Sequence, residues 1–167
     1  GMLDRGFNSP TTTSAGRLFD GVSALVGLCA VSSFEGEGAM ALEHLATSRD
    51  AEPYRYASRE GVVDWGPMLE EILEGGESTD VVASRFHATL TALIVDMASE
   101  VGLQHVALTG GCFQNRRLTE RTATALRAAG FIPLLHRQIP PNDGGISIGQ
   151  IAVARRRDAS EEGTPQP

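Results

Sequence analysis

The sequence predicts an α/β fold in which a mixed sheet is flanked by helices. Apolar residues recur at the 3.6-residue spacing of amphipathic helices in several stretches of the chain. Two short apolar runs in the second half are typical of strands, and each leads into a paired-glycine turn that opens a helix. A helix–strand–helix–strand–helix order of this kind places helices over a sheet.

The chain is expected to begin loosely and to form its first helices soon afterwards. Residues 1–12 are polar and rich in proline and threonine, and Gly1, ahead of a methionine, is expected to be a cloning remnant. Ser14 is suited to cap a helix over Ala15–Leu28, because its hydroxyl can accept a hydrogen bond from a first-turn N–H. A second helix is expected over Glu35–Ala46.

Residues 48–78 carry the weakest pattern, and no role can be assigned to them. Tyr54–Val63 has the composition of a strand. Pro67 suits the first turn of a short helix over Met68–Glu74, which Gly75-Gly76 ends.

The second half of the chain alternates helices with strands and ends in a polar tail. The elements expected there are, in order, the helix Thr79–Val101, the strand His105–Leu108, the helix Arg116–Ala129, the strand Ile132–Leu135 and the helix Ile146–Arg156. Residues 13–157 would then form one lobe, and residues 158–167 are expected to be disordered.

Composition and charge argue against several classes of protein. The chain has 167 residues and a net charge of −7, which suits one soluble domain or lobe. The negative charge argues against a nucleic-acid partner, and the lack of a long apolar run or secretory signal argues against a membrane protein. Cys29 and Cys112 lie far apart without a Cys-x-x-Cys motif, which favours the reducing cytoplasm.

Residues suited to binding a nucleotide follow the first of the two strands. Gly110-Gly111 permits a positive φ and close approach of a ligand to backbone N–H groups, although a tight connection would use the same residues. Asn115 stands where it could bond a ligand hydroxyl or phosphate, or could simply cap the next helix.

Two acidic residues are further candidates, each with a structural alternative. Asp143 precedes the second glycine pair, where it could bind a hard cation or act only as a turn or cap residue. Asp20 lies among apolar neighbours on the first helix, where it could point to solvent or accept two hydrogen bonds from ribose hydroxyls.

Other chemistries lack support in the sequence. Cys112 has no adjacent base and is expected to be buried as a small apolar residue. No Gly-x-Ser-x-Gly motif indicates a hydrolase. The four histidines form no metal-binding spacing and are expected to be structural: His44, His87, His105 and His136.

Four segments together resemble one protein family. They are, in order, SAGRLFDGVSALVGL, SFEGEGAMALEHLA, LTGGCFQNRRL and PPNDGGISIGQ. In this order they resemble the C-terminal part of the HypF carbamoyltransferases, which are maturation factors of nickel–iron hydrogenases. The resemblance extends from about Ser14 to Ala154 and is poor over residues 48–78.

The resemblance implies a fold and a reaction. The fold would be the second lobe of an actin-like, ribonuclease H-like ATPase (the ASKHA class), in the variant shared with the tRNA threonylcarbamoyl-transfer protein TsaD. HypF enzymes convert carbamoyl phosphate and ATP to carbamoyl-adenylate and then transfer the carbamoyl group to the C-terminal cysteine of HypE. Dehydration of that thiocarbamate supplies the cyanide ligands of the hydrogenase iron.

The resemblance also implies roles for individual residues. Asp143 would be a ligand of the active-site metal, and Cys112 replaces a usual valine. The residues matched to nucleotide-binding positions are Asp20, Gly36, Gly110, Gly111 and Asn115.

The implied active site would be completed from outside this chain. Its divalent metal (magnesium, iron or zinc) would also need two histidines from a His-x-x-x-His helix of another lobe, and this sequence contains no such motif. The chain alone is therefore expected to be inactive and to associate with the remaining HypF domains. An apolar face that those domains would cover could also support a homodimer.

Four alternatives remain open from the sequence. Two are enzymes of the same fold: an O-carbamoyltransferase acting on antibiotics or nodulation factors, and the tRNA-modifying relative. The acidic balance and the FEGEGAM segment favour HypF over the tRNA enzyme. The others are a non-catalytic module that docks HypE and an α/β domain without a ligand.

Overall fold

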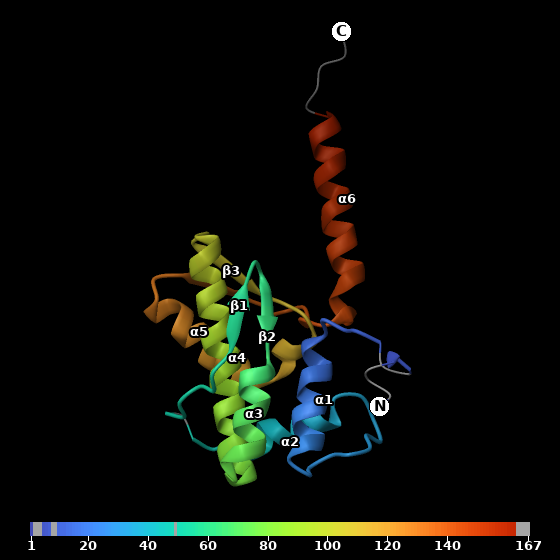
Figure 1. The fold of residues 1–167 in the computed structure, drawn as a ribbon. Helices are drawn as coiled ribbons and strands as arrows, with labels where there is room; N and C mark the ends of the chain where they lie inside the picture. Colours follow the sequence, from blue (N-terminus) through green and yellow to red (C-terminus); the bar gives the residue numbers. More distant parts are fainter. Residues whose placement is uncertain (2–4, 8–9, 49, 163–167) are drawn as a thin grey trace. The chain divides into compact units, whose positions relative to one another are not determined.

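The computed structural model describes residue 1 and residues 5–7, 10–48 and 50–162 of the 167-residue chain. The chain divides into two compact units, Gly1–Leu93 and Ile94–Pro167. The helix α4, Thr79–Val101, has the predicted bounds and contributes residues to each unit (Figure 1).

The first unit begins with two helices that pack together, α1 (Ala15–Leu25) and α2 (Glu37–Leu45). Ser14 caps α1 as predicted, and its Oγ accepts a hydrogen bond from the Arg17 N–H at 3.4 Å. The helix was predicted to reach Leu28 but ends at Leu25, because Gly27 adopts a φ of +76° that turns the chain. Buried side chains of the two helices include Phe19, Val22 and Leu42.

A hairpin stands where the sequence predicts one strand over Tyr54–Val63. The strands β1 (Ala57–Arg59) and β2 (Val62–Asp64) pair antiparallel. Glu60 and Gly61 between them both have positive φ, 54° and 77°, which fits a two-residue hairpin turn. The prediction of one strand is wrong because this turn interrupts it.

The helices α3 and α4 complete the first unit. α3, Gly66–Gly75, ends at Gly76 in the left-handed conformation, as the sequence predicts. α4 buries Phe86, whose ring meets that of Phe19 edge-on with centroids 4.9 Å apart. By length and composition α4 could cross a membrane, but 61% of its apolar stretch is buried inside the protein, as in a core helix.

The second unit is built on a parallel strand pair. β3 (His105–Leu108) and β4 (Ile132–Leu135) have the predicted bounds, and the helix α5 (Arg116–Ala128) connects them. One face of the pair packs against α5 and the end of α4. The buried residues of this core are Ala98, Leu108, Ala123 and Leu126. The predicted α/β fold is thus confirmed, although the antiparallel and parallel pairs are two separate two-stranded sheets.

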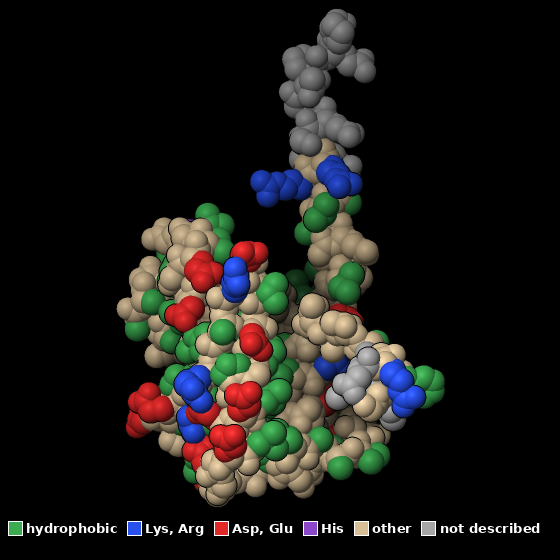
Figure 2. Space-filling view, viewed as in Figure 1, with side chains coloured by type: hydrophobic (Ala, Val, Ile, Leu, Met, Phe, Trp, Pro, Cys, Tyr) green, Lys and Arg blue, Asp and Glu red, His purple; other side chains and the backbone are tan. Residues whose placement is uncertain are grey.

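The last helix, α6 (Ile146–Glu162), is longer than predicted. Residues 158–162 are helical rather than disordered, because neither glycine nor proline interrupts them before Gly163. The rest of the predicted disordered tail, residues 163–167, lies outside the described residues. Figure 2 shows hydrophobic side chains along this helix, and those that are about half exposed are Ile146, Ile148, Ile151 and Val153.

Candidate functional site

Two glycine turns meet at one edge of the parallel strand pair. Because β3 and β4 are parallel, the loops that leave their carboxyl ends emerge at the same edge. After β3 the chain turns at Gly110 into the 3₁₀ helix η2, Gly111–Gln114; after β4 it passes Pro141 into a second 3₁₀ helix, η3, Asp143–Gly145. The Gly110 N–H donates a hydrogen bond to the Pro141 carbonyl at 2.7 Å, so the two turns lie side by side.

The first turn leaves its backbone open. Gly110 adopts φ 101° and ψ 161°, a combination that only glycine adopts readily. A side chain added at Gly111 would meet no other atom within 4 Å. A ligand could therefore approach the backbone closely here, which is the property predicted for this glycine pair.

Asn115 caps the helix that follows. Its Oδ1 accepts a hydrogen bond from the Leu118 N–H at 2.8 Å, and the residue is only 7% exposed. The capping alternative is thus confirmed. A role in ligand binding stays a prediction, and it would use another part of the side chain.

Asp143 is exposed at the start of η3. The cap of this short helix is its neighbour Asn142, whose Oδ1 accepts a hydrogen bond from the Gly144 N–H at 3.1 Å. Among the residues that the structure describes, no three His, Cys, Asp or Glu side chains gather as a metal site. The described residues thus form no three-ligand site around Asp143, and its role as a metal ligand stays a prediction.

The other two predicted site residues, Asp20 and Gly36, share a pocket in the first unit. The pocket has a volume of about 300 Å³, and Asp20 pairs across part of it with Arg17 at 3.1 Å. Its lining residues are Arg17, Asp20, Ser32, Ser33, Phe34, Glu35 and Gly36. Asp20 thus faces a concavity, as its predicted ribose-binding role requires, although no ligand tests that role.

The wall of this pocket is fastened by local hydrogen bonds. Glu37 accepts hydrogen bonds at its Oε2 from the backbone N–H and the hydroxyl of Ser33, at 2.5 and 2.9 Å. These bonds hold the pKa of the Glu37 carboxyl below its usual value. The loop before α2 is therefore held by a charged group of α2 itself.

The sequence alone indicated no role for Gly38, which lies in the first turn of α2. A Cβ at this position would lie 3.0 Å from the Ser23 Cβ and 3.4 Å from Asp20 Oδ1. Gly38 thus allows α2 to pack closely against α1 beside the pocket. The signal for it was the Gly-Glu-Gly spacing at Gly36 and Gly38, since one glycine supplies the positive φ and the other the close contact.

Cys112 and the histidines behave largely as predicted. Cys112 is half-buried, and burial raises the pKa of its thiol, which disfavours the nucleophilic thiolate. His87 is fully buried, and its Nδ1 lies 2.7 Å from the Ala83 carbonyl oxygen, as in a structural core histidine.

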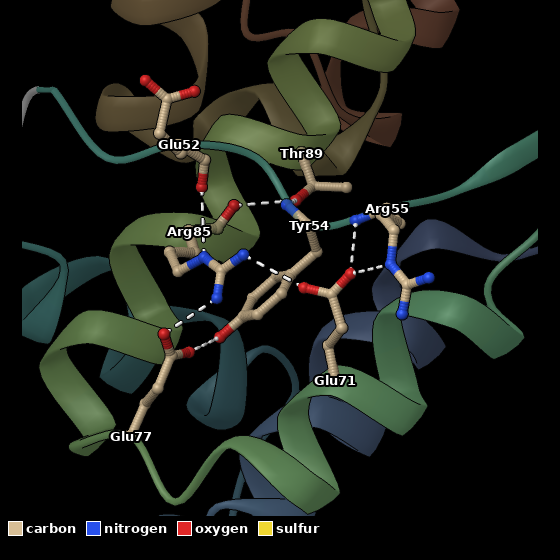
Figure 3. Close-up of polar contacts among 7 residues, drawn as sticks. All are labelled: Glu52, Tyr54, Arg55, Glu71, Glu77, Arg85 and Thr89. Atoms are coloured by element: carbon tan, nitrogen blue, oxygen red, sulfur yellow. Dashed lines mark hydrogen bonds and ion pairs between the residues drawn. The ribbon is translucent and has the colours of Figure 1, made fainter.

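The weakly patterned region 48–78 contributes a polar cluster that the sequence did not indicate (Figure 3). Tyr54 is buried, and its hydroxyl donates to Glu77 Oε2 at 2.5 Å. The guanidinium of Arg85 lies 3.8 Å from the centre of the Tyr54 ring and bonds Glu77 at 2.8 Å and Glu71 at 3.1 Å. The cluster joins α3, α4 and the segment before β1.

The electrostatics of this cluster are those of a structural network. Burial, reinforced by the Glu77 carboxylate, raises the pKa of the Tyr54 hydroxyl. The hydrogen bond from Arg55 holds the pKa of Glu71 below its usual value. Each charged group here faces an opposite charge of the same chain, so the cluster fits a fastening between elements better than a ligand site.

Comparison with protein families and solved structures gives a consistent result. The family model described as "Carbamoyltransferase, Kae1-like Domain, second subdomain" matches residues 1–150. The carbamoyltransferase HypF of Synechocystis sp. is 43% identical over 149 residues, which cover 86% of this chain and 19% of that protein. HypF of Rhodobacter capsulatus is 43% identical over 158 residues, covering 92% of this chain and 21% of that protein.

Solved structures show the same likeness. The crystal structure of full-length HypF in its phosphate- and nucleotide-bound form matches with a TM-score of 0.81 and 34% identity, covering 93% of this chain and 22% of that one. HypF of T. kodakarensis matches with a TM-score of 0.74 and 26% identity, covering 89% of this chain and 20% of that one. The chain thus spans about a fifth of the length of these HypF proteins.

Proposed function

This chain belongs to the HypF carbamoyltransferase family, and we propose that it is the nucleotide-binding lobe of such an enzyme. The observation that carries the proposal is the hydrogen bond between Gly110 and Pro141, which sets two glycine turns side by side at the ends of parallel strands. Backbone N–H groups at such turns suit phosphate, and a carboxylate beside them suits a cation bound to phosphate.

The proposed reaction is carbamoyl transfer through an adenylate. Hydrolysis of carbamoyl phosphate gives carbamate and phosphate, and carbamate attacks the α-phosphate of ATP to give carbamoyl-adenylate and pyrophosphate. The thiolate of the C-terminal cysteine of HypE then attacks the carbamoyl carbon and displaces AMP, which leaves a thiocarbamate. Adenylation supplies a good leaving group, so the lobe need only hold the AMP part, exclude water and admit the thiolate. In the second unit, the turn at Gly110 and Gly111 and the side chain of Asn115 would bind phosphate. In the first unit, the family resemblance gives Asp20 and Gly36 nucleoside-binding positions.

The proposed metal would be shared between this lobe and the rest of the enzyme. The exposed carboxylate of Asp143 suits a divalent cation, whether magnesium, iron or zinc, and further ligands would come from histidines outside this chain. Such an ion would stabilise negative charge on phosphate oxygens. The chain alone would then transfer no carbamoyl group, and detectable carbamoylation of HypE by the 167-residue chain would contradict this.

The proposed partners are HypE and the remaining domains of a cytoplasmic HypF enzyme. The half-exposed isoleucines of α6 support a partner for this helix, because a helix that is apolar on more than one side is normally covered. In the absence of the other domains, a second copy of the chain could cover the same residues.

The first test is calorimetric titration of ATP with Mg²⁺ into the chain and into two variants at Asn115. Asn115→Ala removes both the helix cap and the proposed ligand contact. Asn115→Asp keeps an oxygen for the cap, which bonds the Leu118 N–H at 2.8 Å in the parent chain, but it removes the amide N–H group and adds a negative charge beside the proposed phosphate. Asn115→Ala is expected to bind ATP about 10–150-fold more weakly, the value of one hydrogen bond to a charged ligand. Asn115→Asp is expected to weaken binding at least as much, because charge repulsion adds to the lost hydrogen bond.

The outcomes separate folding from binding. Weaker binding by Asn115→Asp with an unchanged unfolding midpoint would support the nucleotide site. Unchanged affinity in both variants would remove Asn115 from it. If the chain binds no ATP, the same variants in the full-length enzyme decide, and normal ATP binding by both there would overturn the assignment.

A further inference from the structure

A histidine at the end of β4 connects the two glycine turns. His136 follows β4 directly, and its Nε2 lies 3.1 Å from Oγ1 of Thr109, which follows β3 directly. The Thr109 hydroxyl lies 3.5 Å from the Pro141 carbonyl oxygen, which also accepts the Gly110 N–H at 2.7 Å. The Thr109 hydroxyl and the Gly110 amide thus both reach one carbonyl of the β4–α6 loop, and the imidazole contacts that hydroxyl.

The directions of these hydrogen bonds depend on the tautomer of the imidazole. The Thr109 hydroxyl has one hydrogen, and the Pro141 carbonyl lies within its reach. When the hydroxyl donates there, its oxygen accepts from the His136 Nε2–H, which is present in one neutral tautomer and in the protonated ring. The 3.5 Å hydrogen bond between Thr109 and the Pro141 carbonyl is weak by itself. The imidazole strengthens it chiefly by restricting the rotation of the Thr109 side chain.

The position of His136 argues against a role in global stability. The residue is exposed, and the strand pair beside it is already defined by its backbone register and by a core on its other face. A contact made by an exposed side chain at a strand end contributes little to unfolding free energy. Such a contact can still determine the conformation of a loop, because loops have few other contacts.

We propose that His136 is a positioning residue: through Thr109 it holds the loop that carries Asp143 against the Gly110 turn. The open backbone at Gly111 and the carboxylate of Asp143 then face one ligand, the metal-bound phosphate end of a nucleotide. The inference rests on the proposed function for the identity of that ligand. The connection between the turns does not depend on it.

Amide hydrogen exchange at Gly110 tests the connection without any ligand, because the Pro141 carbonyl protects this amide. Replacing His136 by Ala is expected to speed exchange at Gly110 about 2- to 12-fold, the worth of one neutral hydrogen bond. Thr109→Val should do the same, and the double variant should add little to either single one. His136→Gln and Thr109→Ser, which keep a donor and a hydroxyl, should restore slow exchange.

His105→Ala is the matched control, since this exposed histidine lies on β3 at the end opposite the turns. It should leave exchange at Gly110 unchanged, and all variants should keep the unfolding midpoint of the parent chain. Equal exchange in His136→Ala and His105→Ala would overturn the proposal. So would a fall in unfolding midpoint that accounts for the faster exchange.

Titration of ATP with Mg²⁺ then separates this proposal from the proposed function. If Asn115→Asp weakens binding and His136→Ala also weakens it, with rescue by His136→Gln, both stand. If Asn115→Asp weakens binding and His136→Ala does not, the positioning role is wrong and the nucleotide site stands. If neither the chain nor the full-length enzyme uses these residues for ATP, the proposed function fails, and the exchange rates alone decide whether His136 joins the turns.

Discussion

The polar cluster around Arg85 and the pair of turns at the ends of β3 and β4 use similar residues in opposite ways. In the cluster, the side chains of Glu71 and Glu77 are 22% and 25% exposed and both bond Arg85. At the turns, Asp143 is exposed and the backbone at Gly111 is open. The comparison teaches that acidic and basic residues alone do not mark a site, because charges that neutralise one another within the chain hold the fold together.

The largest expected effect is the loss of folding stability caused by Arg85→Ala in the polar cluster. This change removes the ion pair of Glu77 and one of the two ion pairs of Glu71 while both carboxylates stay partly buried, and it removes the cation from the Tyr54 ring. Breaking a buried pair costs about 3–5 kcal/mol, and partial exposure reduces this to about 2–4 kcal/mol. Urea unfolding of the first unit would measure the loss.

Arg55→Ala is the matched control for Arg85→Ala. Arg55 also bonds Glu71, but its side chain is 76% exposed. Its removal should cost less than about 1 kcal/mol, as for other exposed ion pairs. Equal losses in the two variants would show that the cluster is a surface feature and would break the comparison.

The next largest effects are expected when Gly110 and Gly111 are replaced by alanine, one at a time. Gly110→Ala forces a side chain into φ 101° and should destabilise the second unit by about 1–3 kcal/mol. Gly111→Ala meets no neighbouring atom and should leave the free energy of unfolding within about 0.5 kcal/mol of the parent value. Both should weaken ATP binding, because both place a methyl group in the open turn.

Stability and binding must therefore diverge at Gly111. Thermal unfolding paired with calorimetric titration gives both quantities on the same preparations. If Gly111→Ala binds ATP as well as the parent chain does, the open backbone is not a ligand surface, and the two regions would differ only in exposure.

Sequence patterns predicted one of these regions and not the other, for a physical reason. The turns are local, because glycine pairs after short strands permit backbone angles that other residues rarely adopt, whatever surrounds them. The elements β3, β4 and α4 have their predicted bounds. The cluster is not local: Tyr54 meets Glu77 across 23 positions, on a segment with weak periodicity. His136 and Thr109 likewise meet across 27 positions.

Two further errors have the same origin. The hairpin turn places Glu60, not asparagine or aspartate, at a φ of 54°, so the residues gave no turn signal. Gly38 received no role from the sequence, whereas Ser23 of α1 lies against it and leaves no room for a side chain. In each case the deciding contact comes from another element, which periodicity within a segment cannot indicate.

The smallest expected effect is on the pH dependence of stability, and it tests the polar cluster around Arg85. The pKa of Glu71 is lower in the folded chain than its ordinary value of 4.5, chiefly because Arg55 bonds the carboxylate. The unfolded chain therefore binds more protons at this residue, so its contribution to stability is present above pH 4.5 and is lost as pH falls through the folded-state pKa. Glu71→Gln should unfold with a weaker dependence on pH below about 4.5 than the parent chain does.

Two further variants serve as controls for this pH dependence. Glu70→Gln, at the exposed neighbour on α3, should keep the pH dependence of the parent chain. Arg55→Ala should weaken the pH dependence almost as much as Glu71→Gln does. Parallel slopes in the parent chain and Glu71→Gln would mean that neither Arg55 nor Arg85 holds the Glu71 carboxylate in solution, and that this residue does not fasten α3 to α4.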